Sequence, residues 1–375
     1  MKRRISPAPL KQWAEILTII SGKNQKNVKS DTGQYPIYGS GGIIGYATEY
    51  LCEAGTTIVG RKGTIDKPIF VNERFWNVDT AFGISPGDVL DAKYLYYFCR
   101  QFNFKKLDKS TTIPSLAKRD LLQIKMPVPP IMEQRRIVSR IEELFSKLDK
   151  GVETLQTIKQ QLAVYRQAVL KEAFARIEEK RTIREMSVMV TSGSRGWAKY
   201  YADNGALFIR IGNLGHVGIS ICFDDVQCVD LPDKAEGIRS RLYENDVLVS
   251  ITADLGSIGY VPENIPEAYI NQHIAMIRFK NPIQGKFMAW YLRSEYGQKD
   301  LLKNKRGGGK QGLGLDDIRN TRVPNVSNEY AEKIVQEIES RLSVCDSIEQ
   351  TVAEALIQAD AMRQSILRQA FEGEI

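Results

Sequence analysis

Two stretches decide the fold of this chain: "SLAKRDLLQIKMPVP" at residues 115–129 and "GLGLDDIRNTRVPNV" at residues 312–326. They match when the sequence is shifted by 197 residues, the difference between Leu116 and Leu313. The same shift continues without a gap to "LKEAF" at 170–174, which meets "LRQAF" at 367–371. The pairs in register include Asp120 with Asp317, Pro127 with Pro324, Asp149 with Asp346, and Arg166 with Arg363. This internal repeat predicts two copies of one structural unit.

The repeated segment has the heptad spacing of a coiled-coil helix. One apolar set recurs every seven positions: Ile141, Leu148, Leu155, Leu162 and Val169 in one copy, and Ile338, Cys345, Val352, Ala359 and Ile366 in the other. A second set lies three or four positions further on: Leu144, Val152, Ile158, Tyr165 and Ala173, and Leu342, Ile348, Leu356, Met362 and Ala370. The matched register favours two long antiparallel helices that pair with each other. The alternative is two amphipathic helices, each packed on its own domain.

The segments before the two helices have the composition of globular domains. Residues 1–127 and 183–324 are rich in glycine, aromatic residues and short β-branched runs, which predicts mixed sheets with a few helices. We therefore expect an α+β fold with a pseudo-two-fold internal repeat, in which two mixed α/β domains are joined by two long antiparallel coiled-coil helices. The expected boundaries are 1–130 for the first domain, 131–180 for the first helix, 181–327 for the second domain and 328–375 for the second helix.

Composition limits the classes of protein to which the chain could belong. With 375 residues and a formal net charge of +7, the chain is mildly basic, and a polyanion is a plausible partner. Its five cysteines have neither disulfide nor zinc spacing, and it has two histidines, so we expect reduced cysteines and no metal site. We also expect no signal peptide and no membrane span, because no long apolar run occurs.

The glycine-rich run "YPIYGSGGIIGY" at 35–46 raises the question of a nucleotide-binding loop. The dinucleotide fingerprint needs a third glycine where Ile44 stands, and Pro36 interrupts the preceding strand. No Lys-Ser or Lys-Thr follows Gly45, so the phosphate-binding loop of nucleotide hydrolases is also absent. The run therefore predicts a tight turn between two strands.

Several basic or polar loops are candidates for contact with DNA. Each globular segment ends with a predicted aromatic amphipathic helix, at 93–102 and 286–295, and two of the candidate loops, at 105–116 and 303–314, follow these helices at equivalent places in the repeat. Lysine and arginine neutralise phosphates, and arginine and asparagine can pair with base edges. The candidate residues are Arg61, Lys62, Lys109, Thr111, Thr112, Arg210, Asn213, Thr252, Lys305, Arg306, Lys310 and Gln311. The competing interpretation of each is an exposed turn or a solvated surface loop.

Catalytic motifs are not found in the sequence. The N/D-P-P-Y/F motif of amino-methyl transfer does not occur, and "EEK" at 178–180 lies in the tail of a charged helix without the acidic partner of a nuclease site. We therefore predict no catalytic residue in this chain.

The stretch "IPSLAKRDLLQIKMPVPPIMEQRRIVSRIEEL" at 113–144, followed by a long helix ending "AVLKEAF", resembles the conserved region of type I restriction-modification specificity subunits. The runs at 35–46 and 192–214 are similar to parts of their target-recognition domains. The second copy departs from the pattern, because the segment at 324–335 lacks the second proline and the Glu-Gln pair.

This resemblance implies a function and a set of partners. Each target-recognition domain would read one half of an asymmetric, bipartite site in double-stranded DNA, with Tyr38, Ser40 and Gly41 near the DNA. The helices would set the spacer and dock two methyltransferase subunits, and restriction subunits would join that core. S-adenosylmethionine, ATP and Mg would belong to those partners and no cofactor to this chain, which would be cytoplasmic.

Two other functions are weighed against the DNA reader. One is an enzyme that combines recognition and catalysis, and the other is a coiled-coil adaptor that joins proteins and ignores DNA. DNA binding through several phosphates weakens steeply as salt rises, so salt dependence discriminates the reader from the adaptor. Joint alanine replacement of Lys305, Arg306 and Lys310 is expected to reduce that dependence.

Overall fold

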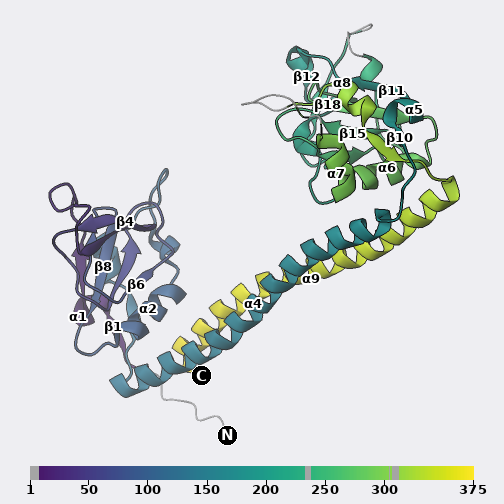
Figure 1. Ribbon diagram of the computed structural model, residues 1–375. Coiled ribbons are helices and arrows are strands. Elements are labelled where there is room, and N and C mark those ends of the chain that lie inside the picture. The colour runs from purple at the N-terminus through teal and green to yellow at the C-terminus, as the bar shows by residue number, and fades with distance from the viewer. Residues whose placement is uncertain (1–7, 233–237, 304, 306–311) are drawn as a thin grey trace. The chain divides into compact units, whose positions relative to one another are not determined.

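The computed structural model describes residues 8–232, 238–303, 305 and 312–375. The chain divides into two compact units: unit 1 comprises Met1–Gln156 and Ala353–Ile375, and unit 2 comprises Thr157–Val352. Two long helices, α4 (Ile131–Phe174) and α9 (Asn328–Glu372), each contribute one part to unit 1 and the other part to unit 2. Each unit thus combines a globular domain with a segment of both helices (Figure 1).

The domain of unit 1 is built on a four-stranded antiparallel sheet. Its strands, in order, are β2 (Leu17–Ser21), β8 (Ala81–Pro86), β5 (Thr56–Gly60) and β6 (Ile69–Val71). Strand β5 is buried along its whole length, because Val59 faces the cluster that contains helix α2 (Ala92–Gln101), whereas Ile58 packs with Phe75. Alternation along the strand therefore gives the sheet two covered faces. A smaller sheet has the order β4 (Gly42–Ala47), β3 (Tyr35–Gly39) and β7 (Trp76–Asn77).

The domain of unit 2 repeats this topology. Its main antiparallel sheet has the order β11 (Ser187–Ser192), β18 (Ile274–Phe279), β15 (Val247–Ser250) and β16 (Ile258–Tyr260). The second sheet has the order β12 (Tyr201–Ala202), β14 (Gln227–Val229), β13 (Ala206–Ile209) and β17 (Ala268–Ile270). Strand β13 pairs in parallel with β17, as β3 does with β7. The predicted internal repeat and mixed α/β domains are confirmed.

A two-stranded sheet in each unit joins the domain to a long helix. In unit 1, β1 (Leu10–Gln12) pairs with β9 (Lys125–Pro127), and Val128 N donates to Pro9 O at 3.0 Å. In unit 2, β10 (Lys180–Thr182) pairs with β19 (Arg322–Pro324), and Asn325 N donates to Glu179 O at 2.9 Å. Helix α4 begins at Ile131, directly after Pro130, because proline lacks the N–H that a helix interior needs.

The predicted heptad set lies along the packed side of both helices. Ile141, Leu162, Val169, Ile338 and Val352 are buried, and Leu148, Leu155 and Ile366 are half-buried. The second set is partly wrong, because Tyr165, Ile348 and Met362 are exposed. All three lie three residues after a heptad position, whereas positions four residues after one, such as Phe145 and Arg166, are buried. After Leu162 the second packed position is therefore four residues on, at Arg166, whereas after Leu155 it is three residues on, at the half-buried Ile158.

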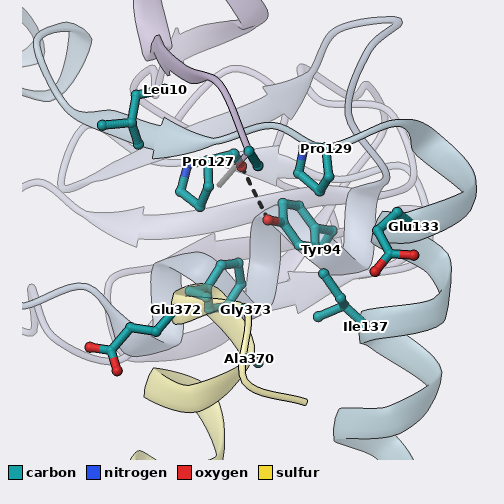
Figure 2. A pocket seen from close by; sticks show the side chains of 11 residues that line it. Leu10, Tyr94, Pro127, Pro129, Glu133, Ile137, Ala370, Glu372 and Gly373 are labelled. Atoms are coloured by element: carbon teal, nitrogen blue, oxygen red, sulfur yellow. Dashed lines mark hydrogen bonds between the residues drawn. The ribbon is translucent and has the colours of Figure 1, made fainter. Parts of the chain in front are cut away.

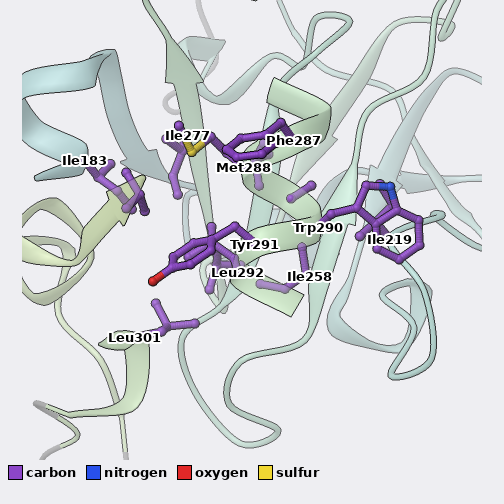
Figure 3. Packing of buried hydrophobic residues seen from close by; sticks show 14 of the residues in the cluster. Ile183, Ile219, Ile258, Ile277, Phe287, Met288, Trp290, Tyr291, Leu292 and Leu301 are labelled. Carbon is purple, nitrogen blue, oxygen red and sulfur yellow. The ribbon is translucent and has the colours of Figure 1, made fainter. Parts of the chain in front are cut away.

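The C-terminal end of each long helix inserts one phenylalanine into a domain. In unit 2, Phe174 packs against Phe287 and Tyr291 of helix α6 (Gln284–Arg293), with 5.4 Å between ring centroids in each pair. In Figure 3, Phe287 lies beside Met288 and close to Ile277, whereas Tyr291 lies lower on α6, above Leu301. In unit 1, Phe371 packs in the same way against Tyr94 and Phe98 of α2, at 5.0 and 5.4 Å. Phe371 is the repeat equivalent of Phe174, so the two contacts are copies of one another.

A cavity of about 270 Å³ lies beside Phe371 in unit 1. Figure 2 shows Tyr94 at its centre, with its hydroxyl donating to Pro127 O at 3.1 Å, and with Ile137 and Ala370 approaching from α4 and α9. Apart from this hydroxyl and the side chains of Glu133 and Glu372, the lining side chains are apolar. The cavity is thus a packing gap where strand β1, the helix ends and α2 meet.

Candidate nucleic-acid interface

In unit 1, the turn after β5 binds the end of the basic loop 105–116. Leu116 N donates to Arg61 O at 2.9 Å, and Gly63 N donates to Pro114 O at 2.9 Å. Lys62 and Ser115 form an isolated antiparallel bridge between the two segments. Two loops that are far apart in the sequence, both proposed as DNA contacts, are therefore held together by backbone hydrogen bonds.

The hairpin turn between β3 and β4 lies beside the same turn. A Cβ atom placed on Gly63 would lie 3.6 Å from Ser40 Oγ, and Gly63 has a left-handed φ of +83°. Gly41, next to Ser40, is exposed and has open space around its Cα. Tyr38 is placed differently, because its ring packs edge-on against Phe75 at 5.4 Å within the domain. The hairpin therefore presents Ser40 and Gly41 at the surface, while Tyr38 supports it from inside.

The two joined loops line a basic cavity of about 460 Å³. Four of the lining residues are cationic: Arg61, Lys62, Lys118 and Arg119. The Arg61 guanidinium donates to Asp79 O at 3.3 Å, and Lys118 Nζ donates to Ile19 O at 2.7 Å. The Lys62 side chain is exposed. Cations at such a density, beside the hydroxyl groups of Ser21 and Ser115, suit phosphate oxygens and the acceptor edge of guanine.

The rest of the basic loop in unit 1 is organised by Asp108. Its carboxylate accepts hydrogen bonds from Ser110 Oγ, Ser110 N and Ser115 N, and these bonds hold the pKa of Asp108 below its usual range. Lys109 is exposed and its Nζ lies 2.9 Å from Asp120 Oδ2, while Thr111 and Thr112 are exposed. The loop thus keeps its polar side chains outward on a locally closed backbone.

Unit 2 builds the same turn after β15. Leu313 N donates to Ile251 O at 2.9 Å, and Thr252 forms an isolated antiparallel bridge with Gly312. These contacts are the equivalents of Leu116 with Arg61 and of Lys62 with Ser115. The backbone scaffold is therefore shared between the units, whereas Ile251 and Thr252 stand where unit 1 has Arg61 and Lys62.

Both histidines of the chain bind this turn in unit 2. Thr252 Oγ1 lies 2.6 Å from His273 Nδ1, and His216 Nε2 lies 2.6 Å from Asp254 Oδ2. Gln272 Nε2 approaches the other ring nitrogen of His273 at 2.8 Å. The described turn at 251–256 therefore carries no lysine or arginine and one carboxylate, that of Asp254, in contrast to the cationic candidate interface of unit 1.

A family model described as "Type I restriction modification DNA specificity domain" matches residues 10–163 and 239–357. The chain belongs to the type I restriction-modification DNA specificity family. One matched segment begins in each globular domain and continues into the following long helix, as the repeat requires.

Individual members of the specificity family resemble this chain at moderate identity. The EcoBI specificity subunit of Escherichia coli is 28% identical over 299 residues, which are 71% of this chain and 61% of that protein. The StySPI specificity subunit of Salmonella potsdam is 23% identical over 78% of this chain and 67% of that protein. The match therefore spans less than two thirds of the length of the EcoBI subunit.

Solved structures share the fold of this family member. One solved structure concerns complex assembly and conformational transition of the type I R-M system. A chain of that structure matches with a TM-score of 0.75 at 16% identity, and the match covers 100% of both chains. The HsdS subunit of Thermoanaerobacter tengcongensis has a TM-score of 0.58 at 16% identity, over 99% of this chain and 98% of that one. At such identity the likeness concerns the fold.

Asn213 is not placed to read a base, contrary to the prediction from sequence. The residue is only 4% exposed. Its Oδ1 accepts from Arg210 N at 2.8 Å, and its Nδ2 donates to Cys222 O and Asp225 O, both at 3.1 Å. A side chain with both polar ends engaged inside the domain closes a loop rather than contacting DNA. Arg210 is half-exposed, with 4.0 Å between its guanidinium and the carboxylate of Asp225.

The basic loop at 303–314 can be followed only in part. Lys305 is exposed, and its backbone N donates to Leu302 O at 3.3 Å. The other predicted contacts on this loop, Arg306, Lys310 and Gln311, lie outside the described residues.

Sequence reasoning missed five residues of the candidate interface: Lys118, Arg119, His216, Asp254 and His273. Lys118 and Arg119 lie inside the repeated "SLAKRDLL" block. The sequence feature that could have identified them is this pair of cations two residues after Leu116, which is shared with Leu313 of the second copy. In the second copy, Arg319 donates to Val190 O at 2.8 Å, as Lys118 does to the equivalent Ile19 O. The histidines carried no spacing signal, because their partners come from a different loop.

Other kinds of site receive no support in the part of the chain that the structure describes. Within residues 8–232, 238–303, 305 and 312–375, no three His, Cys, Asp or Glu side chains are grouped so that they could hold a metal ion. No described helix is long and apolar enough to cross a membrane.

Proposed function

We propose that this chain is the subunit that reads DNA sequence for a type I restriction-modification complex. Each unit would read one half of an asymmetric, bipartite site in double-stranded DNA. The observation that carries the proposal is the repeated turn: the same backbone hydrogen bonds present Arg61 and Lys62 in unit 1 but Ile251 and Thr252 in unit 2. A shared scaffold with different side chains suits the recognition of two different half-sites.

The chemistry of the two interfaces supports different roles in that recognition. The cationic cavity of unit 1 suits phosphate binding and guanine, whose major-groove edge offers two acceptors. The described turn of unit 2, at 251–256, has no lysine or arginine and one carboxylate, so it would add sequence preference with less electrostatic attraction. The residues proposed for contact are Ser40, Gly41, Arg61, Lys62, Lys109, Thr111, Thr112 and Arg210, with Thr252 and Lys305 and the missed Lys118 and Arg119.

The partners follow from the same proposal. Two methyltransferase subunits would dock on the long helices, whose lengths would set the spacer between the half-sites, and restriction subunits would complete the complex. Exposed apolar side chains on these helices support protein docking: Val164, Val344, Ile357 and Met362. S-adenosylmethionine, ATP and Mg would be bound by the partners, and this chain would contribute no catalytic residue. The cytoplasm, where cellular DNA is accessible, is the proposed location.

Methylation mapping tests the proposal against the adaptor alternative. The chain would be co-expressed with the methyltransferase encoded beside it, and N6-methyladenine would be located by sequencing the host DNA. We expect methylation at one split motif with a fixed gap, and none when this chain is omitted. Methylation that does not depend on this chain, or a stable complex that methylates nothing, would favour an adaptor.

A further inference from the structure

The turn after β15 contains an alanine in a conformation that favours glycine. Ala253 has a φ of +58°, and its equivalent in unit 1 is Gly63, with a φ of +83°. The equivalence follows from the preceding residues, because Thr252 bridges to Gly312 as Lys62 bridges to Ser115. The turn therefore requires a left-handed residue in both units, and unit 2 meets this requirement with a residue that has a Cβ.

The side chain of Ala253 gives it no local reason to adopt this conformation. Among the described residues other than glycine, positive φ values occur at Asn245, Ala253 and Asn264. Asparagine tolerates the left-handed region because its short polar side chain bonds to the nearby backbone, whereas alanine has no such group. Relative to glycine, the methyl of Ala253 makes this backbone conformation less stable.

The surroundings of Ala253 hold the strained turn from both sides. Thr252 is bound by His273, and Asp254 is bound by His216. Behind the turn, Ser257 N donates to Ser250 Oγ at 2.8 Å, and Gln298 Nε2 donates to Gly256 O at 2.8 Å. Strained residues that their surroundings over-determine in this way cluster at functional sites.

The methyl of Ala253 is directed to solvent and not to the core. Ala253 is exposed and belongs to none of the buried clusters of unit 2. The Thr252 hydroxyl and the Asp254 carboxylate on either side are already engaged by histidines. The group that this turn offers to a ligand is therefore an aliphatic methyl on a fixed backbone.

We infer that Ala253 is a specificity-determining residue whose methyl contacts the 5-methyl group of a thymine in the half-site read by unit 2. Alanine is one of the side chains that recognise this group in the major groove, where thymine alone presents a methyl. The inference rests on the proposed function, because it needs a DNA half-site at this turn. It extends the proposed function by naming one base of the half-site, a thymine, and the side chain that contacts it.

The contact is tested by removing either of the two methyl groups, the one on thymine and the one on Ala253. Once the methylated motif is mapped, each thymine in it is replaced singly by deoxyuridine, which lacks only the 5-methyl group. Affinity is then measured for the full chain in complex with its methyltransferase, as wild type, Ala253→Gly and Ala253→Asn. We expect one deoxyuridine substitution to weaken wild type about fourfold, the factor for burial of one methyl-sized group, and to leave Ala253→Gly, which lacks the Cβ, unaffected.

The two variants separate the methyl from the strain. Glycine relieves the strain, and asparagine keeps a Cβ in a conformation that Asn245 and Asn264 already adopt in this chain. Wild type that is insensitive at every thymine, or sensitivity that persists in Ala253→Gly, would overturn the inference while the mapped motif leaves the proposed function intact. Failure of wild type to bind any sequence preferentially would refute the proposed function itself and the inference with it.

Discussion

Arg166 on α4 donates a hydrogen bond to Asp346 on α9, with 2.5 Å between the guanidinium nitrogen and the carboxylate oxygen. The same nitrogen also lies 3.0 Å from Glu349 Oε2, and the Arg166 side chain is only 10% exposed. In unit 1, Arg363 on α9 binds Asp149 on α4. The repeat shift carries Arg166 onto Arg363 and Asp149 onto Asp346, so the two ion pairs are copies with the helices exchanged.

Exchanging the charges of the unit 2 pair tests its contribution to stability. We expect Arg166→Asp to lower the free energy of unfolding by about 1–3 kcal/mol, because a partly buried charge-assisted hydrogen bond is replaced by repulsion. The double variant Arg166→Asp with Asp346→Arg should recover part of the loss in a thermal denaturation cycle. As a control, Arg140→Asp alters an ion pair between exposed side chains on α4 and should cost less than about 1 kcal/mol. If the losses in unfolding free energy of Arg166→Asp and Asp346→Arg simply added in the double variant, a direct bond between the two residues would be contradicted.

Truncating the phenylalanines at the helix ends tests their role as anchors. Phe174 is 3% exposed, whereas Phe371 is partly exposed. We expect Phe174→Ala to destabilise the protein by about 3–5 kcal/mol and Phe371→Ala by clearly less, because the cost grows with the cavity left behind. Thermal unfolding of the two variants would make the comparison, and equal losses would show that burial at these two sites is not what limits stability.

Removal of the Asn213 side chain separates a loop-closing role from base reading. Asn213→Ala leaves the backbone N–H of Arg210 and two carbonyls without their partner, so we expect a loss of about 1–3 kcal/mol. Asn204→Ala, at an exposed position before β13, serves as the matched control and should change stability by less than about 0.5 kcal/mol. An unchanged melting temperature together with an altered methylation motif would restore Asn213 as a base contact.

The salt dependence of DNA binding probes the basic cavity of unit 1. Lys62→Ala should lower the slope of log K against log salt by about one unit, because one phosphate contact fewer releases fewer counterions. Lys125→Ala removes an exposed lysine from β9 and should leave the slope unchanged. Titrations of the complex at several salt concentrations would show whether the two variants differ; if they do not, Lys62 is not a phosphate contact.

Helix length provides a test of the proposed spacer. Deleting seven residues from both α4 and α9, in matched register, should shorten each helix by about 10 Å, at about 1.5 Å per residue. The gap between the two methylated half-sites should then shrink by about three base pairs, each about 3.4 Å long. A gap that keeps its length in the mapped motif would remove the helices from spacer selection.

The long-range organisation was predictable because periodic patterns in the sequence indicate it. The 197-residue shift revealed two copies, and heptad spacing revealed the helices that follow the domains. Side-chain contacts were less accessible: the exposure of Tyr165, Ile348 and Met362 depends on which neighbouring position the partner helix covers. Asn213 has the donors and acceptor of a base reader, but its three hydrogen bonds to the backbone are fixed by the folded loop. The strained turn at Ala253 could not be predicted from the sequence, because alanine at a position does not indicate a positive φ there.

The exchanged ion pairs bear on how a chain of this kind could have arisen. Arg166 and Asp149 lie on a single helix, so one copy of the repeat carries both halves of the bond. Two identical single-copy chains, packed antiparallel, could make the bond twice, once with each arginine. A tandem duplication would turn that association between molecules into a contact within one polypeptide. From then on the pairing residues could stay alike while the two turns, now Arg61–Lys62–Gly63 and Ile251–Thr252–Ala253, diverged independently.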